Sequence, residues 1–366
     1  MKIVLDKKDT SICKGIAILM IVFHNFFHSL SGSPGENEFS FHWFRFFEVW
    51  LQIVDEPLDF LRPIVSFFGH YGVHIFIFLS GYGLTRKCLK IFSPLSREPS
   101  FGDLYGIVFK QVLKLWKLMF LGGGVAVVVW WVSLSDPEWS RRIYEFLWTI
   151  TFTNAIVPEH RYYFVSVWWF FSLIVQFYLF FPLLFRYIPV EGRTFGYFLG
   201  VSILLGALLY SPMRHAGVAV YGTILGQLPL FALGVWLAKD GFFPDMKRKT
   251  IIWLLTLLVA SWVFRPFFHM SFFLFVIAFI VFYEKMRASL DWPLLNYIGG
   301  ISSFVFVVHG EIRRPILAWL ESVDYSGRLI EYGSFVVYFF LVILVSVFLR
   351  WFSVKINLFE RKSGMG

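Results

Sequence analysis

The chain has 366 residues, of which 58% are hydrophobic and 16% charged, and its mean hydropathy is +0.68. Soluble domains carry about 25% charged residues and about 45–50% apolar ones, so this composition excludes an ordinary water-soluble fold and predicts an all-α integral membrane protein. The formal net charge of +9 does not indicate a nucleic-acid partner, because most Lys and Arg residues fall in connections predicted on one side of the bilayer.

Ten apolar stretches follow one another along residues 1–366 and predict a single multi-pass membrane domain. Each is near the roughly 20 residues that a helix needs to cross the hydrocarbon layer. The predicted spans are 12–30, 64–85, 107–133, 164–185, 194–211, 217–238, 250–264, 267–283, 297–312 and 332–353. The distribution of Lys and Arg places both termini in the cytoplasm, so we expect the chain in the cytoplasmic (inner) membrane, in contact with its lipids.

The first span carries an ionisable residue, His24, near the predicted centre of the bilayer. It lies ten positions after Lys14, or about 15 Å along a helix. An ionisable group at that depth needs a partner or a hydrated cavity and indicates a functional site. His309 lies ten residues after Gly299 in another span that enters from the cytoplasm. We therefore expect the two imidazoles at matched depth, where they could move a proton; hydrogen bonds to backbone carbonyls are the alternative.

The second span ends in a glycine-rich stretch that is followed by basic residues. Small residues allow a ligand or another helix to approach closely. We predict that four cations on the same side of the membrane form the mouth of a site for a phosphorylated donor such as acyl-CoA. These cations are Arg86, Lys87, Lys114 and Lys117. Contact with lipid headgroups is the alternative for each of them.

Other polar and aromatic residues are weaker candidates. His70 and His74 have the i, i+4 spacing of a metal site, but no Cys or carboxylate joins them, so no metal is predicted. Glu311 could tune His309 or face water. Four residues are predicted to bind substrate: Trp168, Trp169, Gln176 and Tyr82. The two tryptophans could instead anchor the helix at the membrane interface, and Gln176 could equally join two helices.

Four blocks of sequence, in this order, resemble the membrane-bound acyltransferase-3 family. They are KGIAILMIVFH (14–24), GVHIFIFLSGYGLTRK (72–87), SVWWFFSLIVQFYLFFPLL (166–184) and ISSFVFVVHGEI (301–312). The resemblance implies ten transmembrane helices and transfer of an acyl group, usually acetyl, from cytoplasmic acyl-CoA to a hydroxyl of a surface glycan or its lipid-linked precursor. It also implies that His24 is the catalytic histidine and that Arg86 and the basic loop after it hold the donor.

The chain departs from the family pattern in three respects. Lys14 stands where many relatives have Arg, and nine residues separate it from His24 instead of ten, which rotates it by about 100° around the helix. Gln176 stands where an acid is common. The C-terminal SGNH-type domain of some relatives is not found, so a two-step transfer would need a separate periplasmic partner.

These observations together predict an acyl-CoA-dependent membrane O-acetyltransferase that modifies a polysaccharide. His24 is the predicted general base, and His309 shares the proton transfer. The alternative is a proton-coupled exporter or permease in which the two histidines form a proton relay. An enzyme releases free CoA and a carrier does not. A receptor or scaffold without turnover would leave the buried histidines unexplained.

Overall fold

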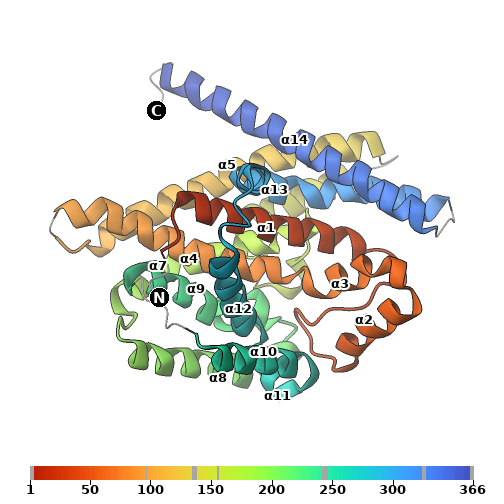
Figure 1. Cartoon of the computed structure of the whole chain (residues 1–366). Coiled ribbons are helices and arrows are strands. Elements are labelled where there is room, and N and C mark those ends of the chain that lie inside the picture. The colour runs from red at the N-terminus through yellow and green to blue at the C-terminus, as the bar shows by residue number, and fades with distance from the viewer. Residues whose placement is uncertain are drawn as a thin grey trace.

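The computed structural model describes residues 4–95, 97–133, 138–154, 156–240, 246–323 and 327–362, which form helices and contain no β-strand (Figure 1). The all-helical prediction is confirmed for these residues. The helices are α1 (Lys7–Phe27), α2 (Phe44–Asp55), α3 (Leu61–Phe68), α4 (Tyr71–Phe92), α5 (Phe101–Ser133), α6 (Trp139–Ile150), α7 (Trp169–Tyr187), α8 (Gly192–His215), α9 (Ile224–Asp240), α10 (Arg248–Val263), α11 (Arg265–Phe268), α12 (Ser271–Met286), α13 (Pro293–Ser322) and α14 (Arg328–Lys362).

The described residues contain fewer helices of spanning length than the ten spans that the sequence predicts. Within the described residues, six helices are long and apolar enough to cross a membrane: Lys7–Phe27, Phe101–Ser133, Ser166–Tyr187, Gly192–His215, Pro293–Ser322 and Arg328–Ile356. Helices α3 and α4, bent by 43° at their junction, form a seventh if they count as one span. The other predicted spans correspond to α9, α10 and α12, which have 16 or 17 residues. At about 1.5 Å per residue they fall short of the roughly 30 Å hydrocarbon layer, so ten spans are not confirmed.

Helix α1 runs through the middle of the bundle, between α13 and α4 (Figure 1). Its contact with α13 is made through the backbone. A Cβ atom on Gly299 would lie 1.7 Å from the carbonyl oxygen of Ser11, and one on Gly15 would lie 2.3 Å from that of Leu295. Only glycine permits this approach, so the glycines at this crossing fix how closely α1 and α13 lie.

Hydrogen bonds show that α1 and α13 run in the same direction. The hydroxyl of Ser11 donates to the carbonyl oxygen of Asn296 at 2.8 Å, across 285 positions of sequence. Farther along, the guanidinium of Arg313 donates to the carbonyl oxygen of Asn25, across 288 positions. The nearly constant offset sets the two helices parallel and in register, which confirms that both enter the bundle from the same end.

The N-terminus of α1 is fixed by its own carboxylates and by α12. Asp6 and Asp9 form a capping box, in which each side chain accepts a hydrogen bond from the other's backbone N–H at 2.8 Å. Such boxes satisfy the free N–H groups at a helix start. Asp9 also accepts from the hydroxyl of Tyr283 at 2.8 Å and pairs with Arg287. This end of α1 is therefore held in place on two sides.

Candidate functional site

His24 lies beside the break between α3 and α4. A Cβ atom on Gly69, at this break, would lie 2.4 Å from the Cβ atom of His24, so the glycine lets α1 pass close to the bend. The Nδ1 atom of His24 lies 3.3 Å from the carbonyl oxygen of Val65, on the last turns of α3. A carbonyl oxygen only accepts hydrogen bonds, so this contact places a proton on Nδ1.

The loop between α1 and α2 places Glu36 against His24. The Oε2 atom of Glu36 lies 3.1 Å from Nε2 of His24 and 3.4 Å from Nδ1 of His70. The side chain of Glu36 is 17% exposed. Burial alone would raise its pKa, but the imidazoles of His24, His70 and His28 outweigh burial and lower the pKa below the usual range. Glu36 is therefore an anion at neutral pH, placed against the ring nitrogens of His24 and His70.

Two hydrogen-bonded contacts hold this loop over the bundle. The hydroxyl of Ser66, on α3, donates to the carbonyl oxygen of Pro34 at 2.7 Å, and its oxygen accepts from Nδ1 of His28 at 3.0 Å. Arg45, at the start of α2, donates to the carbonyl oxygens of Glu36 and Ser40. The position of the Glu36 carboxylate is thus fixed from both sides of the loop.

A second buried carboxyl group, Glu38, lies in the same loop and is 7% exposed. Burial and the neighbouring charge of Glu36 raise its pKa well above the usual range. Two nearby carboxyl groups whose environments push their pKa values apart take different protonation states. Glu36 is therefore ionised at neutral pH, whereas the surroundings of Glu38 favour its protonated form.

His309, on α13, is completely buried. Its Nδ1 atom lies 2.7 Å from the carbonyl oxygen of Phe306, so Nδ1 carries a proton. Its Nε2 atom is buried and has no hydrogen-bond partner in the described part of the chain. In the neutral ring this nitrogen is a free proton acceptor.

The parallel register of α1 and α13 puts His24 and His309 at the same level of the bundle. The two side chains interact electrostatically, although their rings are not in direct contact. Both nitrogens of His24 face acceptors, whereas Nε2 of His309 faces none. The matched depth expected from the sequence is therefore found, and the two histidines differ in what occupies their nitrogens.

His70 and His74 lie at the start of α4, next to this pair. The ring of His74 stacks on Phe272 with centroids 4.1 Å apart, and its Nε2 atom lies 3.1 Å from the amide nitrogen of Gln227. That amide donates, so Nε2 of His74 accepts and the ring is neutral. Among the described residues, no three His, Cys, Asp or Glu side chains are arranged to hold a metal ion.

The four cations predicted to hold a donor lie on the surface near the N-terminal end of the bundle. Lys87 is half-buried near Lys114, and the other three are exposed. A pocket of about 380 Å³ opens elsewhere at this end, between α1, α4, α5, α7 and α13. It is lined by Lys7 and Lys14 and reaches Phe306, whose carbonyl oxygen accepts from His309. None of Arg86, Lys87, Lys114 and Lys117 lines this pocket.

The two tryptophans predicted to bind substrate are buried inside the protein. The indole N–H of Trp168 donates to the carbonyl oxygen of Val307 at 3.1 Å. Trp169 meets Phe39 edge to face, with ring centroids 5.2 Å apart. Trp168 therefore joins its segment to α13 two residues before His309, and Trp169 packs against the loop that carries Glu36.

The other two predicted substrate residues are engaged in contacts within the protein. The amide oxygen of Gln176 accepts from the backbone N–H of Ile224 at 3.1 Å, while its amide nitrogen is buried without a partner among the residues that the structure describes. The hydroxyl of Tyr82 donates to the carbonyl oxygen of Leu5 at 3.0 Å and accepts from its N–H at 2.9 Å. Tyr82 thus fastens the segment before α1 at the end of the bundle where that helix begins, away from His24.

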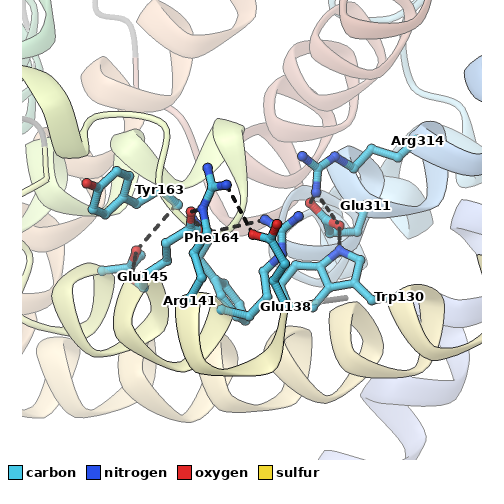
Figure 2. Close-up of polar contacts among 10 residues, drawn as sticks. Trp130, Glu138, Arg141, Glu145, Tyr163, Phe164, Glu311 and Arg314 are labelled. Carbon is cyan, nitrogen blue, oxygen red and sulfur yellow. Dashed lines mark hydrogen bonds and ion pairs between the residues drawn. The ribbon is translucent and has the colours of Figure 1, made fainter. Parts of the chain in front are cut away.

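Glu311 neither tunes His309 by contact nor faces water. It is 2% exposed, and its carboxylate accepts from the indole N–H of Trp130 at 2.6 Å and from Arg314 at 3.3 Å. Figure 2 shows this cluster beside the ion pairs of α6. The guanidinium of Arg142 lies 4.7 Å from the centre of the Trp130 ring and pairs with Glu145 at 3.2 Å. The cluster fastens α6 to α5 and α13.

Sequence reasoning missed three residues of this site: His28, Glu36 and Arg313. His28 and Arg313 each follow a predicted histidine by four residues, which places them on the same helix face, and this spacing could have identified them. Glu36 lies in a loop, where no periodicity relates it to His24. Only the folded loop brings it there.

A family model described as an acyltransferase domain, Acyl_transf_3, matches residues 10–351. No curated protein and no solved structure matches the chain.

Proposed function

The chain belongs to the acyltransferase-3 family of membrane proteins, and on that premise we propose that it transfers an acyl group, in the first instance acetyl, from acyl-CoA to a hydroxyl of a surface glycan or its lipid-linked precursor. The observation that carries this proposal is the pair of buried histidines at one level of the bundle. One of them has a free Nε2 atom, and the other lies against an anionic carboxylate. These are the groups that an acyl transfer needs for moving protons.

In the proposed reaction, Nε2 of His309 takes the proton of the acceptor hydroxyl as its oxygen attacks the thioester carbonyl carbon. The C–S bond then breaks, and the CoA thiolate takes a proton from His24, both of whose nitrogens face hydrogen-bond acceptors. A proton passing from His309 to His24 restores the starting state. The family resemblance names His24 as the base, but both of its nitrogens are occupied here, so we assign the first transfer to His309 and the second to His24.

The proposed donor site is the pocket lined by Lys7 and Lys14, whose end of the bundle we place in the cytoplasm. Its volume of about 380 Å³ falls within the range of about 300–1,000 Å³ for ligand pockets. Lys14 has no ion-pair partner in the described part of the chain. A phosphate of the donor would supply the missing counter-charge, and the pantetheine arm would extend past Phe306 toward His309.

We expect the Lys14→Gln variant to raise the KM for acyl-CoA by about 10- to 100-fold, because a hydrogen bond to a charged group contributes roughly 1.5–3 kcal/mol. The kcat should change little, since this contact is remote from the reacting atoms. The matched control is Lys8→Gln, which removes an exposed lysine of the same helix that is paired with Asp291. Equal KM values for Lys14→Gln and wild type would contradict the donor site.

The function is tested with the purified full chain in lipid nanodiscs. Acetyl-CoA is supplied with a crude extract of lipid-linked and surface glycans, and free CoA is measured with a thiol reagent. Mass spectrometry of the glycans should show the mass of an added acetyl ester. If no CoA is released, and proteoliposomes instead move a labelled glycan in response to a proton gradient, the protein is a carrier and the proposal is wrong.

A further inference from the structure

Arg313 is a cation between the two histidine-bearing helices that the proposed proton transfers do not use. It follows His309 by four residues on α13, so the two side chains lie on one helix face, with Cβ atoms about 5–6 Å apart. Its Nη1 atom donates to the carbonyl oxygen of Asn25 and lies 3.2 Å from the side-chain oxygen of the same residue. Asn25 directly follows His24, so these bonds hold the guanidinium close to both histidines.

The part of the chain that the structure describes supplies no counter-charge to this guanidinium. Within the described residues, no carboxylate lies within ion-pair distance of Arg313, and its Nε atom is buried without a partner. The acid nearest to it in sequence, Glu311, is engaged by Trp130 and Arg314. The hydroxyl of Tyr338, on α14, is buried beside Arg313 and also has no partner. An uncompensated cation is costly in a membrane-embedded site, so the geometry fits a negative charge that the reaction itself brings.

We propose that Arg313 stabilises the oxyanion of the tetrahedral intermediate; this inference rests on the proposed acyl transfer. When the acceptor oxygen bonds to the thioester carbon, the C=O electron pair moves to the carbonyl oxygen, which becomes an anion. When the C–S bond breaks, the pair returns and the C=O bond re-forms. Nη1 is held by Asn25, which leaves Nε and Nη2 to donate to the anion.

The position of Arg313 suits it to stabilise this transient oxyanion and not a permanent negative charge on the acceptor. Its side chain lies one helical turn from His309, whose Nε2 atom determines where the attacking oxygen must be. The carbonyl carbon is bonded to that oxygen in the intermediate, so its oxyanion forms within reach of a side chain as long as arginine. Cationic donors placed where charge develops are the usual means of stabilising such intermediates.

The test compares Arg313→Gln and Arg313→Lys in the nanodisc assay with the wild-type chain. Removing one oxyanion donor lowers kcat by about 10²- to 10³-fold, and we expect that loss for Arg313→Gln with the KM of both substrates nearly unchanged. Arg313→Lys keeps the charge but loses the planar fork, so its kcat should be intermediate. The control is Arg314→Gln, which removes the adjacent, half-exposed arginine and should keep the wild-type kcat.

Chemical rescue separates this role from a purely structural one. Arg313→Ala should regain activity when guanidinium is added below unfolding concentrations, and sodium at equal ionic strength should not restore it. A kcat equal to wild type in Arg313→Gln would overturn the inference, as would a raised acceptor KM with kcat intact. A low kcat that guanidinium does not rescue, together with a lowered unfolding temperature, would also overturn it. In each of these cases, CoA release by the wild-type protein would still support the proposed function.

Discussion

The His24→Gln variant should transfer acyl groups about 10²- to 10⁴-fold more slowly than the wild-type protein, the usual contribution of a general acid or base. Glutamine cannot deliver a proton to the leaving thiolate. Its amide can still donate to Val65 and Glu36, the two partners of the histidine, so the variant should insert and fold. The rate is measured as CoA release in nanodiscs, and folding as the unfolding temperature.

His309→Gln provides the companion measurement. If the two histidines act as one proton-transfer unit, the double variant His24→Gln/His309→Gln should be no slower than the slower single variant, because residues that act together are strongly non-additive. Losses that multiply in the double variant would show that the histidines act independently. Wild-type activity in His24→Gln would remove the mechanism altogether.

The Glu36→Gln variant should lose acyl transfer by a similar factor, about 10²- to 10⁴-fold. The carboxylate is ionised and lies 3.1 Å from Nε2 of His24, so it stabilises the charged ring that returns the proton. Replacing the equivalent carboxylate of a serine-protease triad by its amide costs about 10⁴-fold. Glu36→Asp keeps the charge, but its shorter side chain places that charge farther from His24. The rate of acyl transfer by this variant should fall between those of Glu36→Gln and wild type.

Glu38→Gln is the matched control for Glu36→Gln, because both carboxyl groups lie in the same buried loop. Burial and the charge of Glu36 raise the pKa of Glu38 and favour its protonated form, and an amide closely resembles a protonated carboxyl group in shape. We expect nearly wild-type activity from this variant. Equal losses in Glu36→Gln and Glu38→Gln would mean that the loop, and not the charge of Glu36, supports the reaction.

The sequence predicts the histidines of this site better than their surroundings. Depth along a helix follows from residue number, so His24 and His309 could be placed at one level before the structure was known. Helix periodicity does not predict where the loop that carries Glu36 lies, because the position of a loop depends on contacts such as those of Ser66 and Arg45. The carboxylate partner was therefore beyond sequence reasoning.

The donor cations and the number of spans show a second limit. Arg86, Lys114 and Lys117 are basic and lie near the expected end of the bundle, but they are exposed and do not line the pocket that Lys7 and Lys14 line. Charge patterning gives the side of a membrane and not the direction in which a side chain points. Likewise, hydropathy identified α9, α10 and α12 as apolar, while their 16 or 17 residues leave them too short to count as spans.

The glycine crossing of α1 and α13 limits how this protein can open. Sliding one helix along the other would drive the Ser11 carbonyl into the backbone of α13, so the two helices travel as a single rigid body. The spacing between the imidazoles is then constant throughout a catalytic cycle. Any further opening around His24 then has to come from elements that surround this body, and the loop bearing Glu36 is one of them.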